Sequence, residues 1–117
     1  MTIMVETMKP PSIGMFRFDM STTIDIKVSA EKAKRRVGVY TGNNLSDLLH
    51  GGTPSLVFRD IGVFWRVPVV LSSCSQGYIG RVGEIDVDVE TGKLDIYPTI
   101  LEQIKENAKY LATSASL

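Results

Sequence analysis

The chain has 117 residues, with thirteen basic and thirteen acidic side chains, one histidine and one cysteine. Domains cluster at about 100–150 residues, so this length predicts a single domain. A lone cysteine excludes an intramolecular disulfide framework and a zinc site built from several cysteines. The formal net charge of zero argues against a dedicated nucleic-acid binder, while leaving room for a local basic patch.

The first residues carry no pattern of a secretory leader, because Glu6 and Lys9 interrupt the apolar positions and Pro10–Pro11 follow. The longest apolar run, at residues 67–71, is far shorter than the ~20 residues that cross a bilayer. We therefore expect a cytoplasmic protein that makes no membrane contact.

Residues 1–20 are rich in methionine and follow no clean apolar period. We expect them to form a flexible arm or an extension that docks onto a partner chain. A single domain is then expected at residues 21–114, with a frayed tail at 115–117. Residues 22–28 alternate apolar with polar and are β-branched, which predicts a short strand at the start of the domain.

The next segment predicts a helix from Ala30 to about Tyr40. Ser29 is expected to cap it, and the helix places its apolar residues on one face. Asn43 or Asn44 is then expected to cap a further helical turn, which ends at the glycines 51–52.

The second half of the chain predicts a sheet. Residues 55–59 form a short strand, and residues 63–71 form a longer one that places alternate apolar residues on one face. Pro68 has no amide hydrogen, which predicts that this longer strand lies at an edge of the sheet or carries a bulge there. The polar loop 72–77 then leads to another strand at residues 82–89.

Thr91–Gly92 predicts a hairpin turn. A two-residue loop would place Asp88 opposite Asp95, which is unfavourable. A type I turn with a left-handed glycine is the alternative and would relieve that clash.

Pro98 is well placed near the first turn of the last helix. The apolar stripe of this helix comprises Ile100, Leu101, Ile104, Ala108 and Leu111. Together the elements predict an α+β class: a mostly antiparallel sheet of about four to five strands packed against an N-terminal and a C-terminal helix.

Few residues suggest catalysis. Cys74 and His50 are the only thiol–imidazole couple, and a cysteine nucleophile needs a base beside it. Nothing in their spacing brings them together, so we expect a loop cysteine and a turn histidine. The sequence predicts no catalytic residue, no cofactor and no metal site.

Four carboxylates, Glu84, Asp86, Asp88 and Glu90, fall on one face of the predicted strand. Neighbours on such a face lie about 7 Å apart, so the stripe could hold a cation, meet a basic partner or supply paired acids. The alternative is a solvated outer face with apolar residues behind it, as antiparallel sheets often have.

Glycines 77, 80 and 83 precede this carboxylate strand and are expected to mark a bulge or a close crossing rather than a phosphate loop. A basic run at residues 32–36 is expected on the exposed side of the first helix. The half of the chain up to residue 58 has seven basic and five acidic residues, and the rest has six and eight. This asymmetry, +2 against −2, suggests either self-association or a polar contact within the chain.

The segment Trp65-Arg66-Val67-Pro68-Val69, with Val82-Gly83-Glu84-Ile85 and Thr91-Gly92-Lys93-Leu94, resembles small, largely uncharacterised prokaryotic proteins. Those proteins carry W-x-V-P-V, then G-x-V-G-E-I-x-V-D, then T-G-x-L/V, and the resemblance covers about the last half of the chain. The closing V-D-x-x-T-G element is also similar to the end of PepSY-type domains, small α+β modules associated with protease inhibition or regulatory binding. Neither resemblance implies catalytic residues.

The leading expectation is a non-enzymatic binding or regulatory module that forms a homo-oligomer or binds another protein. The expected interaction surface consists of Trp65, Arg66, Pro68, Ser73, Cys74, Gln76, Tyr78, Glu84, Asp86 and Asp88. The alternative is a small enzyme or ligand-binding protein that uses Glu84, Asp86 and Asp88. Nucleic-acid binding is third, since it requires the basic run and Arg81 to form one surface.

Overall fold

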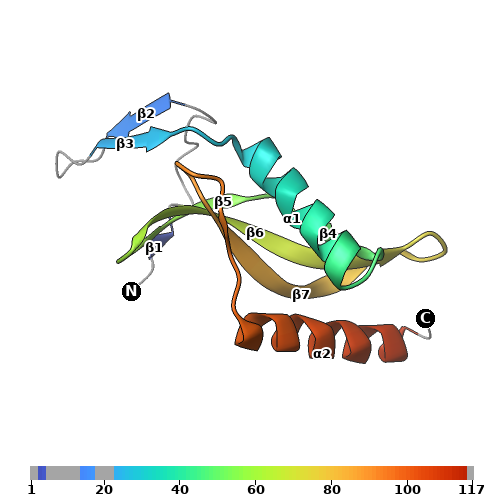
Figure 1. Ribbon diagram of the computed structural model, residues 1–117. Helices are drawn as coiled ribbons and strands as arrows, with labels where there is room; N and C mark the ends of the chain where they lie inside the picture. The colour runs from blue at the N-terminus through green and yellow to red at the C-terminus, as the bar shows by residue number, and fades with distance from the viewer. Residues whose placement is uncertain (1–2, 5–13, 18–22, 116–117) are drawn as a thin grey trace.

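The computed structural model describes residues 3–4, 14–17 and 23–115. Among them, six strands form one antiparallel sheet and two more form a small second sheet, with helices α1 and α2 on opposite sides of the larger sheet (Figure 1). The elements are β1 (Ile3–Met4), β2 (Gly14–Arg17), β3 (Thr23–Ile26), α1 (Ala30–Asn44), β4 (Leu49–Gly51), β5 (Ser55–Arg59), β6 (Gly62–Ser73), β7 (Gly77–Asp88), β8 (Leu94–Asp95) and α2 (Pro98–Ser114). The expected α+β class is confirmed.

Helix α1 begins as expected and ends later than expected. The Ser29 hydroxyl accepts a hydrogen bond from the Lys32 amide at 3.1 Å, which confirms the predicted cap. The predicted further helical turn is wrong, because the helix continues to Asn44 and Leu49–Gly51 form strand β4. Strand β4 pairs with β6 and so satisfies backbone groups on β6 that a helical turn would leave unpaired.

Strand β6 lies in the middle of the sheet, so the expectation of an edge position is wrong. It pairs with β7 on one side and with both β5 and β4 on the other. Pro68 is accommodated because it lies opposite the gap between β4 and β5, where its carbonyl accepts a hydrogen bond from the Gly52 amide at 2.7 Å. The alternative prediction, a bulge near Pro68, agrees with a register shift of the β6–β7 ladder between Val69 and Val70.

Strand β7 begins earlier than expected, at Gly77, because the loop before it contains only residues 74–76. The following turn confirms the predicted hairpin, but not its two-residue pairing. Gly92 has a φ of 76°, and the Asp88 amide donates to the Lys93 carbonyl at 2.9 Å. Asp95 therefore lies opposite Asp86 instead of Asp88.

The main core lies between α1 and the sheet. Trp65 is buried there, and its indole N–H donates to the Val28 carbonyl at 2.7 Å, linking β6 to the segment that precedes α1. The predicted alternation on the longer strand is confirmed, because Trp65, Val67, Val69 and Leu71 are all buried. Ala33 and Val37 cover this layer from α1.

Helix α2 packs against β7, and glycines allow its close approach. A Cβ added at Gly83 would lie 2.6 Å from Ile104 Cγ1, and one at Gly80 would lie 2.8 Å from Leu111 Cδ1. The Asn107 side-chain amide also donates to the Val82 carbonyl at 2.9 Å. Pro98 starts the helix, as predicted. Neither described helix is both long and apolar enough to span a membrane.

Two short strands come from the predicted N-terminal arm. Strand β1 pairs with β5, and β2 pairs with β3. The rest of that arm, residues 1–2, 5–13 and 18–20, lies outside the described residues, as do residues 116–117 of the predicted tail. The flexible or partner-docking role of the arm therefore stays a prediction.

The packing of α2 on β7 predicts that Gly83→Ala destabilises the protein by about 1–3 kcal/mol, because the new methyl group meets the branched, fully buried Ile104. Chemical denaturation measures this loss. Gly80→Ala is the matched control, with a loss below about 1 kcal/mol, because Leu111 can move the end of its flexible side chain. Equal losses in the two variants would contradict this account of the helix packing.

Candidate functional site

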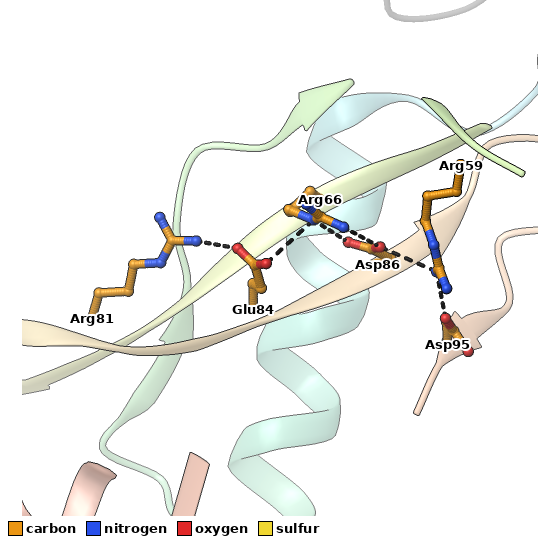
Figure 2. Close-up of polar contacts among 6 residues, drawn as sticks. All are labelled: Arg59, Arg66, Arg81, Glu84, Asp86 and Asp95. Carbon is orange, nitrogen blue, oxygen red and sulfur yellow. Dashed lines mark hydrogen bonds and ion pairs between the residues drawn. The ribbon is translucent and has the colours of Figure 1, made fainter. Parts of the chain in front are cut away.

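A buried ion pair joins the two central strands on the side of the sheet away from α1. Arg66 of β6 lies directly opposite Asp86 of β7, and Figure 2 shows their side chains side by side. Arg66 Nε donates to Asp86 Oδ1 at 2.9 Å, and Arg66 Nη2 donates to Asp86 Oδ2 at 3.0 Å. The side chains are only 19% and 9% exposed. This two-point geometry makes the pair a rigid part of the sheet.

A second arginine lies between two carboxylates of like charge. Asp86 and Asp95 are directly opposite on β7 and β8, an arrangement that is unfavourable alone. Arg59 Nη1 lies 2.5 Å from Asp95 Oδ2 and 3.3 Å from Asp86 Oδ2, so it compensates both charges. The guanidinium also lies over the Phe64 ring, 4.7 Å from its centroid.

Both arginines have a pKa above the ordinary value. The hydrogen bond to Asp95 is the main cause for Arg59, and the hydrogen bonds to Asp86 are the main cause for Arg66; desolvation opposes both. Because the pKa of each guanidinium is raised, the stabilisation from its positive charge is fully present at neutral pH. On the alkaline side it is lost as the pH rises through the raised pKa.

The outer end of the network is more exposed. Glu84 Oε1 lies 3.4 Å from Arg66 Nε, and Glu84 Oε2 accepts a hydrogen bond from Arg81 (Figure 2). The side chains of Arg81 and Glu84 are 53% and 36% exposed. An exposed pair of this kind contributes about 0–1 kcal/mol, so it can open at low cost.

Two cavities adjoin this network and share Glu84, Tyr97 and Ile100. They have volumes of about 190 and 380 Å³. We refer to them together as the charged cleft, which is lined by Arg59, Arg66, Arg81, Val82, Gly83, Glu84, Asp86, Asp95, Tyr97, Ile100, Gln103 and Asn107. The cleft lies where the chain leaves β8 and begins α2.

The structure brings together three residues of the predicted interaction surface, Arg66, Glu84 and Asp86, and they lie in the charged cleft. Trp65 belongs to the buried core, so its expected place on a surface is wrong. The predicted carboxylate face is also not a uniform solvated stripe. Asp86 is buried between arginines, and Asp88 Oδ1 accepts hydrogen bonds from the turn amides of Glu90 and Thr91.

Four further residues of the predicted surface lie away from the cleft. Ser73, Cys74, Gln76 and Tyr78 belong to the tip of the β6–β7 hairpin, where the Gln76 side chain donates to the Ala115 carbonyl at 2.8 Å. These four residues therefore do not form one surface with Arg66, Glu84 and Asp86. Pro68 does adjoin them, because it is half-buried on β6 and lies directly opposite Glu84 of β7.

The sequence did not identify Arg59, Asp95 or Tyr97 as site residues. Arg59 and Asp95 are 36 positions apart, and only the β5–β6–β7–β8 order brings them together. The stripe of carboxylates could have indicated these partners, because an acidic side chain that becomes buried requires a cation beside it. Arg66 alternates with apolar residues on the neighbouring predicted strand and was the cation best placed for that role.

Cys74 lies in a loop, as expected, but the expectation of a turn histidine is wrong, because His50 belongs to strand β4 and pairs with Val70. Both residues are exposed, and no hydrogen bond joins them in the described part of the chain. Within residues 3–4, 14–17 and 23–115, no group of three or more His, Cys, Asp or Glu side chains could hold a metal ion. The basic run and Arg81 also do not form one surface, because Arg81 faces the cleft and α1 lies behind the strands (Figure 2). Because arginines and carboxylates both line the charged cleft, the cleft can bind positively and negatively charged groups of a ligand.

Comparisons with protein-family models, curated proteins and solved structures gave no match to this chain. The resemblances to the W-x-V-P-V pattern and to PepSY-type domains therefore remain expectations from sequence.

Removing the buried carboxylate tests the role of the network in stability. We expect Asp86→Asn to lower the free energy of unfolding by about 2–3 kcal/mol, because Arg59 and Arg66 both lose an anionic partner. Urea denaturation at neutral pH measures the change. The matched variant Glu84→Gln is expected to cost less than about 1 kcal/mol, because its ion pairs are more exposed. Similar losses in both variants would show that burial does not set the strength of these pairs.

Proposed function

We propose that this chain is a non-enzymatic binding module that holds a small zwitterionic ligand in the charged cleft. The observation that supports this most is the pairing of Arg81 with Glu84 at the mouth of the cleft, where charges of both signs face solvent together. A ligand with one charge would meet repulsion from one of these groups. A ligand with both charges can satisfy both.

The inner and outer parts of the network suit different tasks. Arg66 and Asp86 are shielded and held by two hydrogen bonds, so they keep the floor of the cleft in place. The ion pair between Arg81 and Glu84 contributes little free energy because it is exposed. Each side chain can therefore leave the other and bind a ligand group of opposite charge. In the bound form, Arg81 would hold an anionic group and Glu84 a cationic one.

The size and lining of the cleft limit the ligand further. The inner cavity of about 190 Å³ is smaller than the roughly 300–1,000 Å³ typical of sites for drug-sized molecules. Tyr97 and Ile100 supply apolar surface beside the charges. A free amino acid with an apolar side chain matches this combination of volume, charge and apolar contact.

Two other expectations receive less support. Each carboxylate in the cleft already accepts hydrogen bonds from an arginine, which favours holding charge over acid–base catalysis. A homo-oligomer that forms by adding a strand beside residues 63–71 has less support, because β6 already has strands on both sides.

A matched set of three small molecules tests the proposed binding. Leucine carries both charges, 4-methylpentanoate only the negative one and 3-methylbutylamine only the positive one. We expect leucine to bind at least about tenfold more tightly than either analogue in an NMR titration, with shifts at Arg81, Glu84 and Tyr97.

Variants then locate the binding. Arg81→Gln and Glu84→Gln are each expected to weaken leucine binding by about tenfold, and the control Lys109→Gln, on the exposed side of α2, to leave it unchanged. The proposal fails if leucine does not bind, if the three molecules bind equally, or if the shifts lie outside the cleft.

A further inference from the structure

Helix α1 presents an unneutralised basic surface. Lys32, Lys34, Arg35 and Arg36 are all exposed, while Glu31 is the sole acidic residue in α1. Within the described chain, no ion pair involves Lys32, Lys34 or Arg35. Arg36 Nη1 donates to the Gly92 carbonyl at 2.7 Å, which ties α1 to the β7–β8 turn without cancelling its charge.

A mostly apolar groove lies beside these cations. It has a volume of about 410 Å³ and runs between α1 and β8, with Val39 and Tyr40 on one side and Leu94 on the other. Val39 is 57% exposed, although it lies in the middle of a helix that packs on the core. The groove is lined by Arg35, Arg36, Val39, Tyr40, Asn43, Asn44 and Leu94. We refer to these residues, together with Lys32 one helical turn before Arg36 on α1, as the basic groove.

The groove also adjoins an edge of the sheet, formed by strand β8. Strand β8 is the last strand in the order β1-β5-β6-β7-β8, so no described strand pairs with its outer side. A single exposed apolar side chain needs no explanation. An exposed valine in a groove that has a half-buried leucine opposite and cations along its rim is a combination that a partner can recognise.

We propose that the basic groove is a docking surface for an acidic segment of a partner protein. Apolar side chains of that segment would occupy the space between Val39, Tyr40 and Leu94. Its carboxylates would face Lys32 and Arg35, which lack anionic partners in the described chain. The same partner segment is thus bound in two ways. Charge complementarity orients it, and apolar contact supplies affinity.

The observations favour a protein segment over a nucleic acid. A phosphate backbone is held by several cations and polar donors along a continuous track. The exposed surface of the groove is instead mostly apolar, although Arg35, Arg36, Asn43 and Asn44 also line it. Arg81, the cation that a nucleic-acid surface was expected to include, lines the charged cleft and so does not extend this track.

Selection from a phage-displayed library of random dodecapeptides on the full chain tests the proposal. We expect enriched peptides to combine Asp or Glu with Leu, Ile or Phe. Their binding should fall at least about tenfold in Val39→Asp and in Arg35→Glu, because both variants place negative charge at the groove. The side chains of both residues are exposed, so the fold should persist, and circular dichroism checks this.

Ile61→Asp is the matched control, because Ile61 is 71% exposed and lies in the β5–β6 turn, outside the groove. The proposal is overturned by an absence of enrichment, by neutral or basic consensus peptides, or by binding that Ile61→Asp weakens as much as Val39→Asp. It is also overturned if light scattering shows a dimer that Val39→Asp dissociates, since the occupant is then a second copy. Val39-dependent binding of DNA or of anionic vesicles, in place of acidic peptides, would equally overturn it.

Discussion

The carboxylate of Asp86 connects four strands at one point of the sheet. It belongs to β7, accepts hydrogen bonds from Arg66 of β6 and Arg59 of β5, and shares Arg59 with Asp95 of β8. A buried charge is tolerated only where cations and hydrogen bonds surround it. A shift of β7 by one residue would turn Asp86 toward the apolar layer and expose its neighbours Ile85 and Val87. The same contacts therefore define both the register of the sheet and the floor of the charged cleft.

The cleft also depends on how β7 is covered where β8 ends. Strand β8 contains two residues, which leaves most of the length of β7 without a strand partner on that side. Helix α2 packs there, with Gly80 and Gly83 permitting close contact and Asn107 bonding a strand carbonyl. Such cover protects an otherwise open edge. Because α2 starts directly after Tyr97, its first turn stands beside the ion-pair network and forms one wall of the cleft.

The neutral total charge conceals two different surfaces. On the strands, arginines and carboxylates neutralise one another within the cleft. On α1, the cations have few anionic neighbours and lie beside apolar side chains. Figure 1 shows α1 and α2 on opposite sides of the sheet, so the two surfaces belong to separate parts of the molecule. A ligand in the cleft and a partner on α1 can therefore be measured independently.

Local signals in the sequence determined where several elements begin and which face of β6 is buried. Ser29 caps α1, Pro98 opens α2, Thr91–Gly92 marks a turn, and the alternation at residues 63–71 predicts the buried face of β6. These features follow from backbone preferences and from side-chain periodicity, which act over a few residues. The α+β class followed from them.

Only the tertiary structure decided which strands are neighbours and which charges meet. Two short segments, β4 and β5, share one side of β6, and the gap between them accommodates Pro68, so a signal typical of an edge occurs in a central strand. Arg59 lies 27 positions from Asp86 and 36 from Asp95, and no local preference connects them. Burial supplies the reason for their meeting: once the sheet encloses Asp86, its charge requires cations that the neighbouring strands must provide.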